Sequence, residues 1–412
     1  MTAASAGRRA AASAGRAALS GLKVVEFAQL VAGPMAGSLL GDLGADVVHV
    51  EDPVAGDSGR RTGMAKDGTY LWWKVLGRNK RSVTIDLRRP AGQDLARRLA
   101  AWADVVITNM RPGTLDSWGL NWPGLHAVNP KLVMLQVSGY GATTTLRNAP
   151  GYGKVGEARS GVVTITGFPD GPPVHTGFSH ADTVTALMGA FAVQAAVYRQ
   201  ATDPDFDGEW IDLAVDEALF RLIEWQVVHY DQLGIVAERV GNGIPGAPNA
   251  VVNTFLSGDG RWITVTSGTL RSVQNIAVLV GLPPEQFATE EMVGPNRGEL
   301  EHRLAAWMAG RPAEECLAAM SQAGVVAAPV LNVEDIVADQ TYAERGNIIT
   351  VDDADVGPLR MQGVIPRLHN HGGAVWRQAP ALGQHNDEVF TGELKLSTSE
   401  LAQLRADKII GG

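Results

Sequence analysis

One carboxylate, Asp182, stands where a turn-forming segment meets a long apolar one. The segment before it, TGFPDGPPVHTGFSH, is rich in glycine and proline, and the residues after it are mostly apolar. This pattern predicts a helix that starts near Asp182 and is buried from Ala186 to Tyr198. Aspartate is a favoured N-cap residue, and the dipole at a helix N-terminus would keep its carboxylate ionised and available as a nucleophile. The residue by itself leaves a capping role and a catalytic role open.

Short runs of β-forming residues alternate with helical patterns from residue 22 onward. The helical segment 90–103 begins with Pro90, a residue suited to the first turn of a helix. The expected strands are continuous runs of Val, Ile and Leu, as in parallel sheets with helices on both faces. The predicted fold is therefore α/β, with a Rossmann-like open parallel sheet. The expected strands are residues 22–28, 46–51, 82–87, 104–110 and 132–140.

The length of 412 residues predicts more than one domain. We expect a flexible tail at 1–20, a large Rossmann-like domain at 21–224 and a smaller α+β domain at 225–330. The pattern changes after residue 225, where a glycine-rich loop precedes the strand-like RWITVTSG. Residues 331–412 are rich in loops and are expected to link the domains and return to the large one.

Composition argues against several classes of function. The chain has 35 Lys and Arg against 44 Asp and Glu, and its net charge of −9 argues against a nucleic-acid surface. The single cysteine, Cys316, lies in a helical pattern, so we expect no disulfides and a reducing, cytoplasmic location. The histidines lack the spacing of metal ligands. No apolar run reaches the roughly 18 uncharged residues of a membrane span. We therefore expect no metal and no membrane partner.

The phosphate-binding motifs that often accompany such a sheet are missing. The first crossover reads FAQLVAGPMAGSLLGDLG, without G-x-G-x-x-G after the strand, and the sequence contains no G-x-x-x-x-G-K-[ST]. Pro34 also stands where the dinucleotide fingerprint needs the backbone to approach a pyrophosphate closely. We therefore expect neither NAD nor ATP as a ligand.

Several segments, taken in order, resemble the class III CoA-transferases. They are GLKVVEFAQLVAGPMAGSLLGDLGADVVHVE, NKRSVTIDL, ITNMRPGTLDSWGL, NPKLVMLQVSGYG and GFPDGPP with the Ala-Asp that follows it, and the later APALGQHNDEVF resembles the closing motif of the family. The family includes formyl-CoA transferase, carnitine CoA-transferase and the alpha-methylacyl-CoA racemases. The resemblance implies an enzyme that moves coenzyme A between an acyl-CoA and a carboxylic acid.

The resemblance also implies a role for Asp182, which occupies the place of the family's nucleophile. Its carboxylate would attack a thioester to form a mixed anhydride, and the released CoA thiolate would convert this anhydride into an aspartyl-CoA thioester. An acceptor carboxylate would then reverse these steps. Such covalent catalysis divides one difficult transfer into easier ones.

By resemblance, CoA binds to loops after the first and fourth strands and to the end of the third. Arg88 is the expected phosphate partner, because a guanidinium binds phosphate oxygens in a forked geometry. Departures from formyl-CoA transferase leave the adenine and phosphate contacts open, with Arg60, Arg61 and Arg111 as alternatives. The implied CoA-binding residues are Gln29, Leu30, Val31, Ala32, Gly33, Pro34, Ile85, Arg88, Asn109 and Met110.

The same resemblance indicates an acyl pocket. Racemases of the family carry a His-Asp pair where this chain has Tyr152 and Gly153, neither of which can act as a base near neutral pH. This argues against a racemase, so racemization is kept only as the second enzymatic alternative. Tyr152 is expected to face the acyl pocket, and Glu157 either contacts the substrate or has a structural role. A loop that would act as a mobile flap over the site contains Gly241, Gly243 and Gly246.

The resemblance finally implies how the chain assembles. The family forms interlocked dimers and includes pairs of homologous subunits of which one is catalytic. A homodimer or a heterodimer with a homologous subunit is therefore expected. A non-catalytic subunit remains the alternative from another class of function, although the presence of Asp182 argues against it. The donor and acceptor acids are left open.

Overall fold

The fold is that of a computed structural model, which describes residues 17–245, 247 and 249–411. The chain divides into two compact units. The first contains the chain up to Ser160 together with residues 176–222 and 342–412, and the second contains residues 161–175 and 223–341. Most of the expected N-terminal tail lies outside the described residues. Its last four residues, 17–20, form a turn whose backbone N–H groups donate to the carbonyls of Leu43 and His371.

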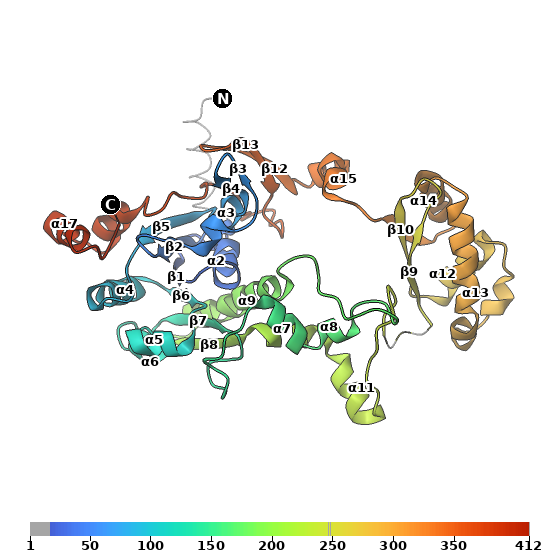
Figure 1. The fold of residues 1–412 in the computed structure, drawn as a ribbon, viewed down its shortest axis with the longest axis horizontal. Coiled ribbons are helices and arrows are strands. Elements are labelled where there is room, and N and C mark those ends of the chain that lie inside the picture. The colour runs from blue at the N-terminus through green and yellow to red at the C-terminus, as the bar shows by residue number, and fades with distance from the viewer. Residues whose placement is uncertain (1–16, 246, 248, 412) are drawn as a thin grey trace. The chain divides into compact units, whose positions relative to one another are not determined.

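A six-stranded parallel sheet forms the centre of the first unit, with the strand order β5-β2-β1-β6-β7-β8 (Figure 1). This confirms the predicted α/β fold with an open parallel sheet. Strand β8 was not expected from the sequence, because Glu209 and Asp212 interrupt the apolar run in its residues EWIDLA. The strands are β1 (Lys23–Phe27), β2 (Asp46–Glu51), β5 (Lys80–Thr84), β6 (Val105–Thr108), β7 (Val133–Ser138) and β8 (Glu209–Ala214).

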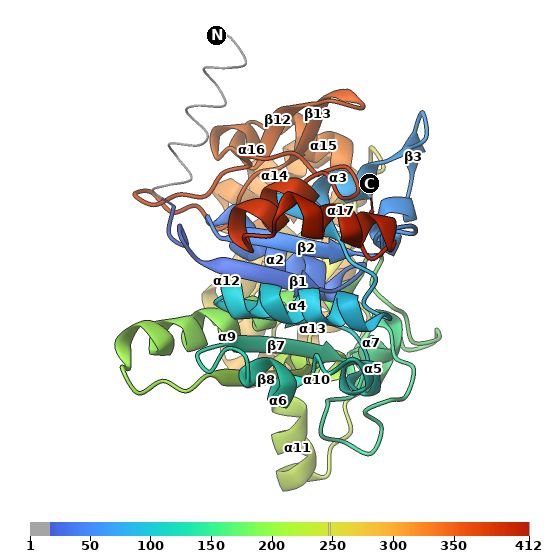
Figure 2. The same ribbon diagram turned by 90° about the vertical axis from the view of Figure 1, so that its left-hand side faces the viewer.

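One face of this sheet is covered by α4 (Pro90–Trp102) and by C-terminal elements, as Figure 2 shows for α4 and α17 (Thr398–Ala406). Its core contains Val25, Phe27 and Val48 from the strands and Leu99 from α4. Burial of such aliphatic side chains contributes on the order of 2 kcal/mol each. The C-terminal return to the large unit, which includes the π-helix Glu388–Glu393, therefore completes its core.

The opposite face of the sheet carries α2 (Ala32–Asp42), which packs on β1 and β2, and α9 (His180–Thr202), which packs on β7 and β8 and against α2. This face is not purely apolar. Glu26 and His49 stand opposite each other in the β1–β2 register, and both side chains are fully buried. Buried ionisable groups are costly unless they are paired, so this pair requires a local explanation.

Helix α9 is longer and more exposed than the expected core helix. It spans His180–Thr202, and its side chains Leu187, Phe191 and Tyr198 are 51%, 75% and 72% exposed in this chain. Among the described residues, α9 is the one helix long and apolar enough to cross a membrane by length and composition alone. Its uncharged run, between Asp182 and Arg199, is still shorter than the roughly 18 residues expected of a span. Core helices of soluble proteins meet the same criterion, so the finding is weak evidence for a membrane.

Shorter elements connect the strands of the large sheet in the first unit. Two small antiparallel hairpins, β3–β4 and β12–β13, accompany them. The remaining elements are η1 (Ser58–Arg61), β3 (Ala65–Lys66), β4 (Thr69–Tyr70), α3 (Leu71–Leu76), α5 (Pro112–Trp118), α6 (Trp122–His126), α7 (Gly153–Arg159), α10 (Val215–Phe220), β12 (Ile348–Asp353) and β13 (Gly357–Gln362).

The second unit has its own core around an antiparallel sheet with the order β11-β10-β9. Val265 of β10, Ile276 of α12 and Leu304 of α13 meet in this core, together with the buried Cys316 of α14. The unit has the α+β character that was predicted. Its elements are α8 (Val162–Ile165), α11 (Trp225–Leu233), β9 (Val251–Leu256), β10 (Trp262–Ser267), α12 (Leu270–Leu279), η3 (Pro284–Phe287), α13 (Glu290–Ala309), α14 (Ala313–Gln322), β11 (Val326–Pro329) and α15 (Val333–Ala338), while η2 (Arg221–Ile223) and α16 (Gln340–Glu344) lie at its boundaries.

Candidate active site

The carboxyl ends of β1 and β6 meet at the middle of the large sheet. Strands β2 and β5 follow on one side of β1 and strands β7 and β8 on the other side of β6, so the two strands lie at the switch point where open α/β sheets bind ligands. The loops after them are joined by two hydrogen bonds. The N–H of Gln29 donates to Oδ1 of Asn109 at 2.9 Å, and the Asn109 amide donates to the Gln29 carbonyl at 2.7 Å.

A cavity of about 440 Å³ opens at this edge of the sheet. It brings together eight of the residues that were proposed from the sequence, although they lie as far apart in the chain as Gln29 and Asp182. Loop residues after β1, β6 and β7 meet the start of α9 there. The predicted residues that line it are Gln29, Leu30, Val31, Ala32, Asn109, Met110, Tyr152 and Asp182.

Asp182 lies in the first turn of α9, three residues after the N-cap position, Ser179. Its carboxylate is packed against the backbone of Gly153, the first residue of α7. A Cβ atom at Gly153 would lie 2.8 Å from Cγ of Asp182 and would overlap its Oδ2. Within the described part of the chain, no group donates a hydrogen bond to this carboxylate. The Asp182 carboxylate is therefore held by packing while its oxygens remain available for reaction.

The electrostatic surroundings of Asp182 differ from the expectation. Burial and the negative charge of Glu157 raise the pKa of Asp182 to about 6, although the Lys154 charge acts in the opposite direction. The helix dipole was expected to favour the ionised form more strongly. At pH 7 a carboxyl with this pKa is still about nine-tenths ionised. It is then more basic than an ordinary aspartate, which favours nucleophilic attack.

Glu157 and Lys154 form an ion pair on α7. The Lys154 ammonium lies 2.9 and 3.0 Å from the two Glu157 carboxylate oxygens, and Glu157 is only 1% exposed. Lys154 also donates to the carbonyls of Thr176 at 2.8 Å and Phe178 at 3.0 Å. The lysine thus ties α7 to the turn that precedes α9, and Glu157 acts on Asp182 as a buried charge.

Ile85 and Arg88 lie in a neighbouring cavity of about 200 Å³, not in the cavity of Asp182. The two cavities share Gln29 and Met110. The Arg88 guanidinium is exposed and already paired with Asp86 at 2.7 Å and with Asp52 at 2.8 Å. A phosphate at this site would therefore have to compete with two carboxylates for Arg88.

The alternative arginines differ in their surroundings. Arg60 makes hydrogen bonds of 2.6 and 2.7 Å to both carboxylate oxygens of Glu51 and lies over the Trp73 ring at 4.1 Å. Such a bidentate, stacked guanidinium serves the fold. Arg111, by contrast, lines the cavity that contains Asp182. Among the described residues, Arg111 is the one arginine that lines this cavity.

The remaining predicted residues lie away from the cavity lining. Gly33 and Pro34 are buried in the first turn of α2, where a Cβ at Gly33 would lie 2.5 Å from Cβ of Ala28. Gly241 and Gly243 belong to the second unit, in which a Cβ at Gly241 would contact the ring of Phe168 at 2.9 Å. Gly246 lies outside the described residues.

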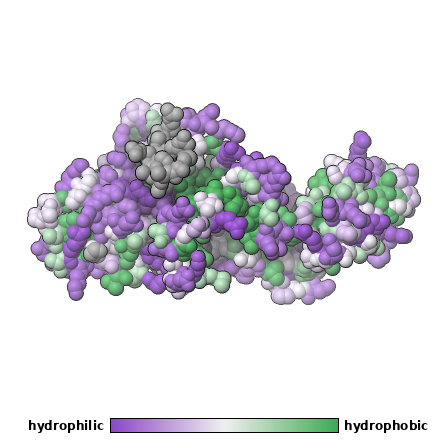
Figure 3. All heavy atoms as spheres, turned by 90° about the horizontal axis from the view of Figure 1, so that it is seen from above, coloured by the Kyte–Doolittle hydropathy of each residue, from purple (hydrophilic) through white to green (hydrophobic). Residues whose placement is uncertain are grey.

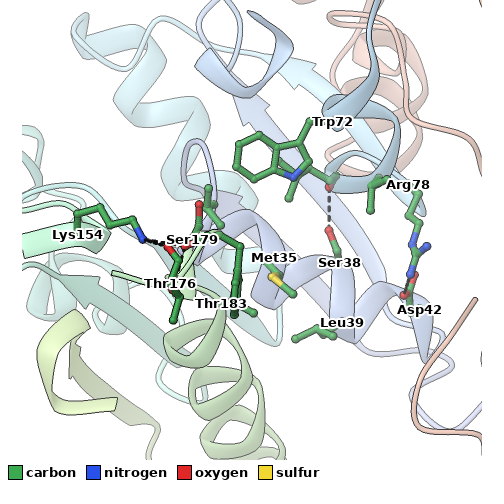
Figure 4. Close-up of a pocket in the computed structure, with 15 residues that line it drawn as sticks. Met35, Ser38, Leu39, Asp42, Trp72, Arg78, Lys154, Thr176, Ser179 and Thr183 are labelled. Atoms are coloured by element: carbon green, nitrogen blue, oxygen red, sulfur yellow. Dashed lines mark hydrogen bonds and ion pairs between the residues drawn. The ribbon is translucent and has the colours of Figure 1, made fainter. Parts of the chain in front are cut away.

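A larger cavity of about 720 Å³ lies next to the loop at Val31, which lines both cavities. Its lining is mostly apolar and comes from α2, α3 and the turn before α9 (Figure 4). Both cations in its wall are already paired, Arg78 with Asp42 and Lys154 with Glu157. Apolar lining residues include Met35, Leu39, Trp72, Val75, Leu76 and Phe178.

Several residues of the site were not expected from the sequence. Gly153 was noted only because it lacks a carboxylate, yet its missing side chain makes room for Asp182. Ser138, the last residue of β7, and Gly139, directly after it, also line the cavity. Their position at the carboxyl end of a central strand was the available signal. Within the residues that the structure covers, no group of three or more His, Cys, Asp or Glu side chains is placed to hold a metal ion.

Comparison with known proteins agrees with this arrangement. Residues 19–386 match CoA-transferase family III. The chain is 38% identical over 397 residues to the succinyl-CoA–D-citramalate CoA-transferase of Chloroflexus aurantiacus, covering 95% of this chain and 98% of that protein. It is 27% identical over 411 residues to the formyl-CoA:oxalate CoA-transferase of Streptomyces avermitilis, covering 95% and 99%.

The fold is similar to that of a CAIB/BAIF family protein from Brucella suis, with a TM-score of 0.79 and 32% identity over 92% of this chain and 100% of that one. The chain therefore belongs to CoA-transferase family III, and its activity is the transfer of coenzyme A between an acyl-CoA and a carboxylic acid.

Proposed function

We propose that Asp182 is the nucleophile of this CoA-transferase and carries CoA as an aspartyl thioester. The observation that carries the proposal is the Asp182 carboxylate itself, which lines the switch-point cavity, accepts no hydrogen bond from the described residues and has a pKa raised to about 6 by burial and by Glu157. A carboxylate kept mostly ionised but unusually basic is suited to attack a thioester carbonyl.

The proposed reaction begins when an Asp182 oxygen attacks the acyl-CoA carbonyl carbon. The C–S bond breaks, CoA leaves as a thiolate, and a mixed anhydride remains. The thiolate then attacks the aspartyl carbonyl of this anhydride, which releases the donor acid as a carboxylate and forms the aspartyl-CoA thioester. The acceptor carboxylate attacks that thioester, and the expelled thiolate attacks the acceptor's acyl carbon. Asp182 is regenerated as a carboxylate, and no net proton, oxidant or reductant is needed.

We propose that CoA follows the two connected cavities. Gln29, Leu30, Val31, Ala32, Asn109 and Met110 would surround the pantetheine arm, and Gly33 and Pro34 would support their loop as the first turn of α2. Ile85 and Arg88 would contact the nucleotide end, with Arg111 as a further cation near the thioester. Tyr152 would face the acyl group. Gly241, Gly243 and Gly246 remain candidates for a flap.

The proposed donor is succinyl-CoA and the proposed acceptor a small, hydroxylated dicarboxylic acid. This proposal is supported by the names of two relatives, the succinyl-CoA–D-citramalate CoA-transferase at 38% identity and the succinyl-CoA–L-malate CoA-transferase alpha subunit at 34%. An acceptor panel of citramalate, malate, glutarate and oxalate would separate the named specificities of the relatives.

Intact mass spectrometry tests the mechanism. Wild-type protein mixed with succinyl-CoA should gain the mass of one CoA less one water, and hydroxylamine should remove it. Asp182→Asn, which keeps the side-chain volume, should form no adduct and should lose at least about 1,000-fold in kcat, as expected when a covalent nucleophile is removed. An adduct of the same size on Asp182→Asn would contradict the proposal.

The two alternatives give different results in the same series. A racemase would exchange the α-hydrogen of a 2-methylacyl-CoA for deuterium in heavy water without forming an adduct. A non-catalytic subunit would bind CoA but form no adduct with any donor, and it would become active only with a homologous chain. The relatives include separately named alpha and beta subunits of one enzyme, so the assay begins with the chain expressed alone.

We propose an interlocked homodimer, located in the cytoplasm, as the active form. The stripe of Leu187, Phe191 and Tyr198 on α9 supports a dimer, because these side chains are half to three-quarters exposed in the single chain. Figure 3 likewise shows groups of hydrophobic residues, in green, at the surface. An unpaired, buried Cys316 is compatible with a reducing compartment.

A further inference from the structure

Leu30, which lines the cavity of Asp182, has an unusual backbone conformation. Its φ is +68°, in the left-handed region that residues other than glycine rarely adopt. This conformation is unfavourable for a residue that carries a Cβ atom, because the Cβ lies too close to the following carbonyl oxygen. The residue lies between Gln29 and Val31, so its conformation determines the direction in which the backbone of this loop faces the cavity. Such strain persists only where the surroundings hold the backbone in place.

The side chain of Asp57 holds Leu30 in this conformation. The N–H of Leu30 donates to Oδ1 of Asp57 at 2.9 Å, and the same oxygen accepts from the N–H of Gly59 at 2.7 Å. Asp57 is 1% exposed, and its own N–H donates to Glu51 at 2.9 Å. The carboxylate is therefore fixed in position before it meets the loop.

Three charged residues behind Asp57 complete the arrangement. Nε2 of His49 lies 3.1 Å from Oδ2 of Asp57, and Nδ1 lies 2.6 Å from Oε2 of Glu26. Glu26 also pairs with Lys80, whose Nζ is 3.0 Å from the same oxygen. His49, Glu26 and Lys80 are fully buried. Two carboxylates thus alternate with two cations, and the cluster is close to neutral overall when His49 is protonated.

The protonation states fit this arrangement. Burial alone would lower the pKa of His49, but hydrogen bonds with Asp57 and Glu26 outweigh it and raise the pKa to about 9. Burial would likewise raise the pKa of Asp57, but the hydrogen bond and charge of His49 and the N–H groups of Gly59 and Leu30 lower it to about 2. Both ring nitrogens of His49 therefore donate near neutral pH, each to one carboxylate.

We propose that Asp57, oriented by His49 and Glu26, is a positioning residue that pre-forms the Gln29–Val31 loop for CoA binding. The loop is then held at two successive residues, at Gln29 by Asn109 and at Leu30 by Asp57. Because the ordering is complete before the ligand arrives, CoA binding does not have to supply it. The inference rests on the proposed use of this cavity for CoA.

A double-mutant cycle tests the proposal, with the Kd of free CoA from calorimetry and the KM for succinyl-CoA as readouts. Asp57→Ala should weaken CoA binding about tenfold, the equivalent of about 1.4 kcal/mol, with kcat changed less than about threefold. In a Leu30→Gly background the same substitution should change Kd by less than about twofold, because glycine adopts a positive φ without a clamp. An equal loss in both backgrounds, or a loss in kcat alone, would overturn the proposal.

Amide hydrogen exchange provides a second readout that does not depend on activity. The Leu30 amide should exchange slowly in the wild type and faster in Asp57→Asn, because a neutral amide oxygen is a weaker acceptor than a carboxylate. Unchanged exchange in Asp57→Asn would also overturn the proposal. This measurement still decides if the Asp57→Ala chain does not fold.

Asp353→Asn is the matched control. Asp353 is likewise buried, pairs with a cation (Lys74, at 2.9 Å) and accepts two backbone N–H groups in a turn, but it lies outside the three cavities. It should leave the Kd of CoA and the exchange of Leu30 unchanged. The Kd of CoA does not depend on the covalent step, so a failed nucleophile proposal for Asp182 and a failed positioning proposal for Asp57 are distinguishable.

Discussion

At the scale of single residues, the pKa of Asp182 depends on a second carboxylate nearby, that of Glu157. Glu157 is buried and Asp182 is half-buried, and burial together with the negative charge of Glu157 raises the pKa of Asp182. Lys154 pairs directly with Glu157, so its charge offsets only part of this repulsion at Asp182. Burial and the charge of Glu157 together therefore keep the Asp182 carboxylate more basic than an ordinary aspartate.

This arrangement predicts how the activity depends on pH. In the wild type, kcat/KM should fall about tenfold per pH unit below pH 6, as protonation removes the Asp182 carboxylate. Glu157→Gln removes a like charge, so the pKa of Asp182 should fall and the acid limb should move to lower pH. Activity at pH 5, relative to the plateau, should rise by up to about tenfold.

The measurement is a kcat/KM profile from pH 4.5 to 8 for Glu157→Gln and for Asp353→Asn, which removes a buried lysine partner elsewhere. The control should keep the wild-type limb. A limb that moves to higher pH in Glu157→Gln would show that Glu157 lowers, and does not raise, the pKa of Asp182.

At the scale of elements, the close approach of α7 and α9 positions the carboxylate of Asp182, the proposed nucleophile. Gly153 begins α7, and the Asp182 carboxylate occupies the volume that a Cβ would need. Gly156, one turn later on α7, similarly admits Val215 at the start of α10. Glycines at these two contacts allow α7 to lie against its neighbours.

Gly153→Ala should therefore displace the Asp182 carboxylate. We expect kcat to fall about 10- to 100-fold, since a displacement of about 1 Å in a reacting group has effects of this size. CoA binding should change little. Activity and calorimetry check both expectations, with Gly298→Ala as the control, because a Cβ at Gly298 in α13 meets open space. Wild-type kcat in Gly153→Ala would mean that Asp182 can relocate freely.

At the scale of the whole molecule, α9 connects the site with the proposed dimer. Asp182 is in its first turn, while Leu187, Phe191 and Tyr198 form one exposed stripe further along. A helix that is apolar on all sides is normally buried on all sides. The single chain covers only part of α9, and this exposed stripe supports the proposed dimer.

Phe191→Asp should weaken the proposed dimer, because it places a charge in a surface that would be desolvated on association. Sedimentation velocity should show the wild type as a dimer and the variant shifted towards monomer at micromolar concentration. Val128→Asp, a similar change at a partly exposed residue after α6, should remain dimeric. A wild-type chain that sediments as a monomer would exclude the homodimer.

The sequence by itself determined the parallel sheet. Strands that are buried on both faces consist of continuous apolar runs, and the crossovers between them show the periodicity of helices. Missing phosphate-binding motifs argued against NAD and ATP, and the order of several short segments indicated the family. The start of α9, at His180 and so close to Asp182, could be predicted from the turn residues before it. These are local signals, each carried by neighbouring residues of the chain.

Only the tertiary structure decided which of these residues share a site. It showed that Arg88 lies outside the cavity of Asp182 and that Gly153 lies against the Asp182 carboxylate. It also showed that His49, in β2, and Asp57, in the segment after that strand, form the hydrogen bonds that hold Leu30 in a left-handed conformation. Distances between residues far apart in the chain, and the pKa values that depend on them, arise from packing, which no local pattern records.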